Sequence, residues 1–293
     1  MEFEHIPVLL KEAVEFLDVQ DNQWYVDATF GRGGHTREIL SLGGSVIALD
    51  HDKEAINYGM RHFVQAIEAK RIIFERENFE HIDEVVQKHG KKGAVAGILA
   101  DFGISSPQVD DRNRGFSFQE DAPLDMRMDD RLGVQAKDLV NALGKNELID
   151  VFTRFGGEHH ARTIADTIVQ NRKVKPIETT EELARMIGKV VRREGHLHPA
   201  TKVFQALRIV VNDELGSIER FLPKAFEALS VNGKLVTIAF HEGEDRLVKH
   251  YEQDLIAASQ ARPLTTKPIE PSVEEIKMNP RSRSAKLRAI EKL

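Results

Sequence analysis

Three glycines and an aspartate near the N-terminus have the residue types and spacing of a ligand-binding loop. Residues 27–35 read Asp-Ala-Thr-Phe-Gly-Arg-Gly-Gly-His, and they follow a short β-rich run that begins at Trp24. Glycine has no Cβ, so it adopts positive φ angles and lets a ligand approach the backbone, while a following helix offers N–H groups without partners inside the helix. The pattern predicts a nucleotide-binding loop, and an ordinary tight β–α turn is the alternative.

The spacing of the glycines departs from the dinucleotide fingerprint G-x-G-x-x-G. Gly31 and Gly33 fit it, but Thr36 stands at the third glycine position, and the acid Asp27 comes before the glycines. A ligand without a pyrophosphate tolerates that change. S-adenosylmethionine (SAM) is such a ligand, since it presents an amino acid, a ribose and an adenine and carries a positive sulfonium that carboxylates favour.

Three expected strands end in aspartate, at Asp27, Asp50 and Asp101. In a doubly wound sheet, ligands lie beyond the carboxyl ends of the strands, so all three should face one crevice. Asp50 lies about where an acid reaches the ribose hydroxyls of a bound nucleoside. Asp52 could instead bind the ligand while Asp50 caps the next helix, and we assign Asp50 to the ligand because of its strand-end position.

The segment from Asp101 to Gln108, Asp-Phe-Gly-Ile-Ser-Ser-Pro-Gln, resembles the acid-and-proline loop of enzymes that methylate exocyclic amines. The amino nitrogen of cytosine or adenine is a poor nucleophile because its lone pair is delocalised into the ring. A carboxylate that accepts its N–H groups restores nucleophilicity and later takes up the proton. Methylation at cytosine C5 ordinarily uses a cysteine, and the chain has no cysteine.

These loops must be positioned by the strand ends of a parallel sheet, and the hydrophobic periodicity of the sequence predicts such a sheet. Strands are expected at 24–27, 45–50, 71–75 and 95–101, with helices between them, and then helical patterns continue until a fifth strand at 234–240, introduced by a turn at Asn232-Gly233. We therefore expect an α/β fold, a Rossmann-like sheet of residues 1–109 and 214–293, with an inserted helical domain at 110–213.

Length, net charge and hydropathy limit the class of protein and its cellular location. The chain has 293 residues and a net charge of −6, with no apolar run long enough to span a membrane and no signal-peptide pattern at its start, so we expect a cytoplasmic protein. Residues 277–293 carry a local net charge of +5, since Glu291 is their only acid. Such a tail could dock on phosphates, or it could be a solvated basic terminus.

Other polar clusters are open to two interpretations. Residues 112–118 interleave two arginines with two phenylalanines, which suits either RNA binding or a small core anchor. Residues 158–160 and 241–246 contain histidines beside acids. Neither matches a closed ligand set, so we predict no metal and favour roles at a polar edge or helix face.

Taken together, the motifs resemble the MraW-type family of ribosomal RNA small subunit methyltransferases H. The resemblance covers essentially the whole chain and rests on long strings at residues 5–12, 27–35, 101–111, 114–118, 123–129, 199–209, 211–215 and 279–288. Residues 241–246 depart from it, because the family usually has His-Ser-Leu-Glu-Asp-Arg where this chain has His-Glu-Gly-Glu-Asp-Arg.

The resemblance implies SAM-dependent methylation of N4 of a cytidine in the decoding centre, the P site, of bacterial 16S rRNA. The implied partner is small-subunit rRNA or the assembled small ribosomal subunit, the inserted domain would recognise this substrate, and a homodimer stays open. Amine activation by Asp101 is our own hypothesis. The SAM contacts that the resemblance implies are Gly33, Gly34, His35, Asp50, Phe79, Asp101 and Gln108.

Two functions from other classes remain as alternatives at this point. An NAD-dependent oxidoreductase would use a similar sheet, but the missing third glycine and the Asp101 loop count against it. A non-catalytic RNA-binding protein could retain a vestigial nucleotide fold, although the intact strand-end acids disfavour that interpretation.

Overall fold

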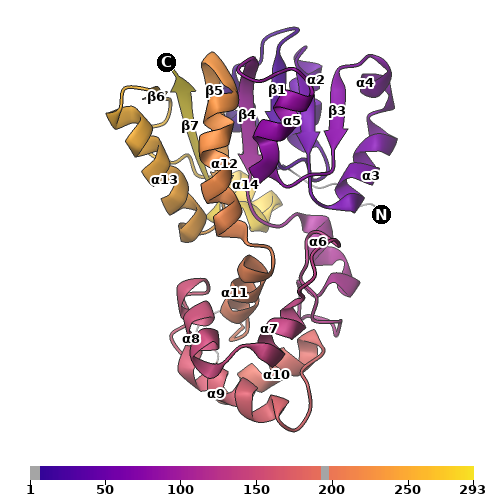
Figure 1. Cartoon of the computed structure of the whole chain (residues 1–293), viewed down its shortest axis with the longest axis vertical. Helices are drawn as coiled ribbons and strands as arrows, with labels where there is room; N and C mark the ends of the chain where they lie inside the picture. The colour runs from indigo at the N-terminus through magenta and orange to yellow at the C-terminus, as the bar shows by residue number, and fades with distance from the viewer. Residues whose placement is uncertain (1–6, 193–197) are drawn as a thin grey trace. The chain divides into compact units, whose positions relative to one another are not determined.

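The computed structural model describes residues 7–192 and 198–293. The chain divides into two compact units, one of residues 1–103 and 215–293 and one of residues 104–214 (Figure 1). The helical patterns predicted an inserted domain at residues 110–213, and the role of that segment in substrate recognition stays a prediction. No helix in the described ranges is long and apolar enough to cross a membrane.

The first unit is built on a seven-stranded sheet of order β3-β2-β1-β4-β5-β7-β6. Strands β1 to β5 pair in parallel, and β7 is antiparallel to both β5 and β6. The strand bounds are β1 Trp24–Asp27, β2 Ser45–Leu49, β3 Ile72–Glu75, β4 Val95–Asp101, β5 Leu229–Ala239, β6 Ala261–Pro263 and β7 Lys286–Lys292. The expected Rossmann-like α/β fold is confirmed.

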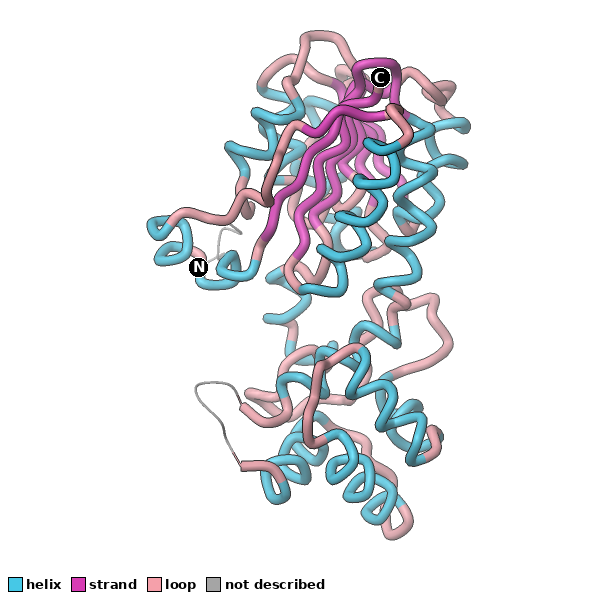
Figure 2. Tube along the Cα trace, turned by 90° about the vertical axis from the view of Figure 1, so that its left-hand side faces the viewer, coloured by secondary structure: helices cyan, strands magenta, loops and turns pink. Residues whose placement is uncertain are grey.

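Helices cover both faces of this sheet (Figure 2). Successive strand residues point to opposite faces, so Val26 packs in a core with α5, α12 and α13, while Tyr25 packs in a second core with α1 and α2. The helices of this unit are α1 Leu10–Leu17, α2 Gly34–Ser41, α3 Lys53–His62, α4 Val64–Glu68, η1 Phe79–His81, α5 Ile82–Lys88, α12 Glu214–Ala228, α13 Glu242–Ala257, α14 Val273–Met278 and η3 Pro280–Ser284.

The second unit is helical and has a hydrophobic core of its own, which includes Leu148, Ile164 and Leu207. Its helices are α6 Ser106–Asp110, η2 Arg112–Arg114, α7 Ala136–Ala142, α8 Lys145–Arg154, α9 Ala161–Arg172, α10 Thr180–Val190 and α11 Thr201–Val211. The unit lies in the chain between β4 and β5. An insertion at that point leaves the parallel pairing of β4 with β5 intact.

Local details differ from the sequence-based expectation. The helical pattern expected at 137–155 is divided at Gly144, where α8 begins, and that expected at 201–229 is divided at Asn212 and Asp213. The turn expected at Asn232-Gly233 lies inside β5, where Asn232 has φ +63° and the pairing register with β4 shifts.

The basic C-terminal segment is not a tail. Residues 286–292 form β7 between β5 and β6, so the expectation of a solvated terminus is wrong for them. Arg288 donates to Asp245 at 2.7 Å, and Lys292 donates to the carbonyls of Phe226 and Leu229 at 2.9 and 2.8 Å. These cations are used to hold the strand against α13 and the end of α12.

Candidate functional site

The glycine loop joins β1 to α2 at the carboxyl edge of the sheet. Gly33 is the N-cap of α2 and has φ +70°, and Gly31 has φ +53°. The left-handed region is costly for residues with a Cβ, so both positions favour glycine. The loop therefore delivers the first turn of α2, with its N–H groups, to the edge where a nucleotide would bind.

Packing also requires these glycines, for a reason that the sequence does not reveal. A Cβ on Gly33 would lie 2.4 Å from the Phe30 ring, and one on Gly34 would lie 2.7 Å from Pro7. The positions that side chains would occupy are thus filled by protein atoms. His35, the next residue, is buried, and its Nε2 lies 3.1 Å from the carbonyl oxygen of Val8, which can only accept.

Asp50 follows β2 and is tied to the glycine loop. Its Oδ2 accepts the Gly31 N–H and its Oδ1 accepts the Asp52 N–H, both at 2.8 Å. Each carboxylate oxygen has a second lone pair, so these bonds leave acceptor capacity for ribose hydroxyls. Asp52 is the N-cap of α3 and accepts the Glu54 N–H, as our assignment of the two acids expected.

The ends of β1 and β4 carry two further acids that lie in one hydrogen-bond network. Asp27 is buried, and its Oδ2 accepts the Thr36 hydroxyl at 2.6 Å while its Oδ1 accepts the Thr29 N–H at 3.3 Å. The Thr29 hydroxyl oxygen in turn accepts the Asp101 N–H at 2.6 Å. Asp101 Oδ1 is buried, and no described residue hydrogen-bonds to it. A buried acceptor of this kind is costly unless a ligand supplies the donor.

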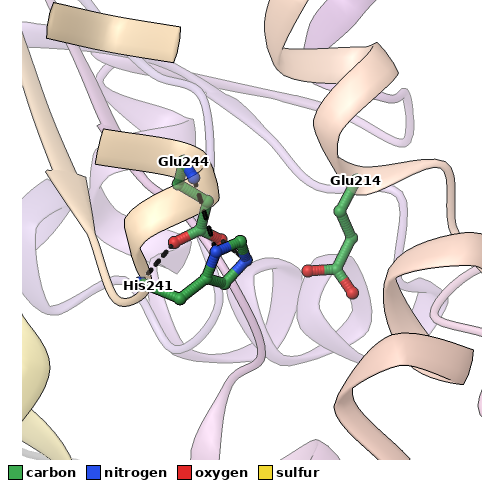
Figure 3. A group of neighbouring side chains, drawn as sticks. All are labelled: Glu214, His241 and Glu244. Carbon is green, nitrogen blue, oxygen red and sulfur yellow. Dashed lines mark hydrogen bonds and ion pairs between the residues drawn. The ribbon is translucent and has the colours of Figure 1, made fainter. Parts of the chain in front are cut away.

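A fourth acid reaches this edge from the start of α13 (Figure 3). Glu244 is fully buried, and its Oε2 accepts the backbone N–H groups of Phe240 and His241 at 2.7 and 3.1 Å. Its Oε1 would lie 3.9 Å from a Cβ on Gly103, so the carboxylate is close to the backbone that follows β4. Glu214, also drawn in Figure 3, pairs with Arg208 inside the second unit.

His241 caps α13 with its ring. Nδ1 accepts the N–H groups of Gly243 and Glu244 at 3.1 and 3.4 Å, which places the ring proton of the neutral form on Nε2, 3.3 Å from Glu244 Oε1. A Cβ on Gly243 would lie only 3.0 Å from this ring, so glycine makes room for the cap. Glu242, the added acid of this loop, is exposed in the first turn of α13, where the helix dipole favours negative charge.

Burial, and to a smaller extent the charges of neighbouring acids, raises the pKa of the aspartates at this edge. Burial, opposed by hydrogen bonds from Thr36 and Thr29, raises the pKa of Asp27 to about 6. Burial, and then the negative charges of Asp27 and Glu244, raise the pKa of Asp101 well above its usual range. Burial also raises the pKa of Asp50. A cation bound at this edge would relieve the repulsion, which suits a sulfonium ligand.

The other two predicted SAM contacts lie in different settings. Phe79 starts η1, after β3, and its ring packs on Phe102 and Phe221 with centroid distances of 5.6 and 5.2 Å. Gln108 belongs to the second unit, where it is buried and its Oε1 accepts the Ser105 N–H at 2.9 Å. The structure brings Gly33, Gly34, His35, Asp50, Phe79 and Asp101 to the carboxyl edge of the sheet, and their contacts with SAM stay a prediction.

In the second unit, the arginine and phenylalanine motif has a structural role. Phe116 and Phe118 pack against the core of the unit, and Arg114 donates to the carbonyls of Arg127 and Met128 at 3.0 and 2.8 Å. The core-anchor interpretation is therefore confirmed for Phe116 and Phe118. Glu158 likewise accepts the His160 N–H at 2.7 Å near the start of α9.

Two residues that the sequence reasoning did not select contribute to the site. Thr29 connects the backbone of Asp101 to the glycine loop, and Glu244 adds a buried carboxylate. The position of Thr29 two residues after a strand-end aspartate was a usable signal. Nothing in the local sequence showed that Glu244 turns inward, because it stands among three other charged residues.

Comparisons with known proteins identify the family. Residues 2–293 match the MraW methylase family. The chain belongs to this family. It is similar to the ribosomal RNA small subunit methyltransferase H of Streptococcus equi, with 40% identity over 100% of this chain and 98% of that protein. It is 45% identical to the same-named protein of a Wolbachia strain, over 99% of each chain.

Solved structures are also similar to this MraW-family chain. An rRNA methylase from Streptococcus thermophilus is 11% identical, with a TM-score of 0.47 and coverage of 98% of both chains. A Streptococcus mutans protein in complex with SAH is 14% identical, with a TM-score of 0.48 and coverage of 98% of this chain and 99% of that one. The family predicted from the motifs is confirmed, and neither alternative function is supported by the names of the relatives.

Proposed function

We propose that this chain transfers the methyl group of SAM to N4 of a cytidine in the decoding centre of small-subunit 16S rRNA, and that it does so in the cytoplasm. Methyl transfer to rRNA is supported by membership of a methylase family and by relatives named for small-subunit rRNA. The choice of an amine rather than a ring carbon is supported by the absence of cysteine and by the buried carboxyl oxygen of Asp101.

The residues present at the sheet edge fit SAM. Asp50 keeps acceptor capacity for ribose hydroxyls, the first turn of α2 lies beside it, and the buried acids favour a positive ligand. We assign SAM binding to the residues that the family resemblance implies, which are Gly33, Gly34, His35, Asp50, Phe79, Asp101 and Gln108. When bound, SAM supplies an electrophilic methyl group on a positively charged sulfur.

Asp101 is the observation that carries the proposal. Its buried Oδ1 has no described donor, so an N–H of the cytosine amino group would satisfy it. Accepting that N–H increases electron density on N4, and the same carboxylate then takes the proton that N4 loses once it is methylated. A raised pKa suits this second task, because it makes Asp101 a stronger base.

We assign RNA recognition to residues 110–213, which lie in the second unit. Its separate hydrophobic core supports this role, because a self-supporting insertion can present a substrate-binding surface without disturbing the sheet. Several of its arginines are used internally, as at Arg114 and Arg127, so exposed residues must supply the RNA contacts.

The test is methyl transfer from labelled SAM to small ribosomal subunits that lack the modification. We expect one methyl group per subunit, and mass spectrometry of the digested nucleosides should identify N4-methylcytidine. Subunits that already carry the modification serve as the control and should accept nothing. Tight SAM binding without transfer to subunits, assembly intermediates or naked rRNA would contradict the proposal.

A further inference from the structure

The basic residues near the C-terminus fall into two groups with different surroundings. Those of β7 are engaged inside the first unit, as described for Arg288 and Lys292. Those that precede β7 are exposed: Lys277, Arg281 and Arg283. They lie in residues 277–284, which contain no acid and which we call the basic turn. The chain as a whole has a net charge of −6, so this segment is positively charged in a protein that is negatively charged overall.

The backbone of the basic turn is held in one conformation. Ser282 is fully buried, and both its N–H and its hydroxyl donate to the Asn279 carbonyl, at 3.0 and 2.8 Å. The Ala285 N–H donates to the Ser282 carbonyl at 2.8 Å. Because Ser282 points inward, the residues on either side of it, Arg281 and Arg283, are directed to solvent. A fixed turn loses little backbone entropy when it binds a partner.

The register of β7 places the basic turn at the carboxyl edge of the sheet. Strand β7 is antiparallel to β5, with its first residue Lys286 paired with Ala239, the last residue of β5. Asp101, the last residue of β4, pairs with Ile238 in the same region. The turn immediately precedes Lys286 in the chain, so it lies at the strand ends that carry the candidate site. Figure 1 draws the neighbouring α14, in yellow, at this end of the sheet.

Contacts also connect the basic turn to the glycine loop. Glu275, in α14, accepts the Leu9 N–H at 2.8 Å, and the adjacent Val8 carbonyl lies 3.1 Å from the ring of His35. Pro7 fills the space beside Gly34. A short series of contacts thus links α14, the residues before α1 and the first turn of α2. Glu275, the acid nearest the turn in the sequence, is engaged in this link through its Oε1.

We propose that Lys277 and Arg283 bind phosphates of the RNA backbone next to the nucleotide that enters the candidate site. The proposal rests on the proposed function for the class of partner. Arginine and lysine are the side chains that contact backbone phosphate in RNA and DNA complexes, and such contacts position the substrate without reading its sequence. An acidic body needs a local positive surface of this kind to hold a polyanion near its strand ends.

The experiment compares two double variants with the same change of charge. Lys277→Gln with Arg283→Gln removes the proposed phosphate contacts. Lys70→Gln with Lys92→Gln removes two exposed lysines that precede β3 and β4, at the opposite edge of the sheet. Binding of the full chain to unmethylated small ribosomal subunits, and to naked small-subunit rRNA, is measured over a series of KCl concentrations. Transfer kinetics and SAM affinity are measured beside it.

We expect the first variant to weaken subunit binding about tenfold and to reduce the slope of log K against log[KCl] by about 1 to 2, since each phosphate contact contributes roughly one unit. KM for subunits should rise, while kcat at saturating subunits and the affinity for SAM stay unchanged. The control variant should keep the wild-type slope. An equal loss of binding affinity in both variants would show that only the net charge of the protein matters, and it would overturn the proposal.

Other outcomes separate this proposal from the proposed function. An unchanged salt slope in the first variant contradicts the phosphate contacts even if the wild type methylates subunits normally. Absence of wild-type transfer contradicts the proposed function, while the salt slopes still decide whether the turn binds RNA. Binding of the same variants to polyglutamate is measured as a further control. If the first variant binds polyglutamate more weakly but binds rRNA unchanged, the proposal is contradicted and an acidic protein is indicated as the partner.

Discussion

The ends of β1 and β4 carry the same residue at the same place in the fold, yet the two aspartates have different surroundings. Asp27 gives one oxygen to the Thr36 hydroxyl and the other to the Thr29 N–H. Asp101 has a buried oxygen without a described donor. An acid at the end of a strand can therefore stabilise the adjacent loop or keep an oxygen available for a ligand. The hydrogen-bond donors that the protein places around its carboxylate determine which role it has.

The two acids are nevertheless coupled. Thr29 contacts both, since its N–H reaches Asp27 and its hydroxyl accepts the Asp101 N–H. The charge of Asp27 also helps to raise the pKa of Asp101. Asp27 therefore holds the glycine loop in place and at the same time contributes to the basicity of its neighbour.

Replacement of each acid by asparagine gives the largest expected contrast. Asp101→Asn removes the proton acceptor, so kcat for methyl transfer should fall by about 10²-fold or more. Asp27→Asn keeps a carbonyl oxygen for Thr36 and should retain most of the rate. Rates of transfer to unmethylated subunits check this, with the free energy of unfolding in urea as the control for folding. Near-normal transfer by Asp101→Asn would remove Asp101 from the mechanism.

The pH dependence of stability should show that the ionised form of Asp27 destabilises the fold. Its pKa rises from 3.8 to about 6 on folding, so its protonated form stabilises the fold fully below pH 3.8 and this contribution is lost as pH rises through 6. Asp27→Asn should thus gain stability relative to the wild type between these values, by up to about 3 kcal/mol. Urea unfolding at pH 4 and pH 7 measures the change. A difference that does not vary with pH would show that Asp27 is ionised throughout.

Glu244→Gln should produce the smallest effect and should act through Asp101. A glutamine carbonyl can still accept the N–H groups of Phe240 and His241, but the negative charge that raises the pKa of Asp101 is lost. Asp101 then reaches its ionised, active form at lower pH, so the acid limb of kcat/KM against pH should move to lower pH. An unchanged limb together with lower stability would leave Glu244 with a capping role alone.

Local patterns predicted much of this fold. The run at 95–101 gave the bounds of β4 because a buried parallel strand is almost continuously apolar and here ends at an acid. Alternation of strands and helices predicted the parallel sheet. Strand β7 and its partner β6 were not predicted, because charged residues interrupt the apolar pattern of β7. Pairing with β5, the buried side chains of Leu287 and Ile290, and the hydrogen bond from Arg288 to Asp245 hold this strand in the sheet. The interruption between α7 and α8 lies at Gly144, the N-cap of α8. It was not predicted because the helical spacing of apolar residues continues across it.

The sequence by itself determined the family, the glycine loop and the acids at the strand ends, because these depend on residue types at short spacing. Only the tertiary structure decided what each acid does. The donors that close Asp27 and the carboxylate that faces the Asp101 loop come from segments as distant as residues 36 and 244. Burial and charge at a point depend on all the chain that packs there, and so the proton affinity of Asp101 is a property of the folded sheet edge.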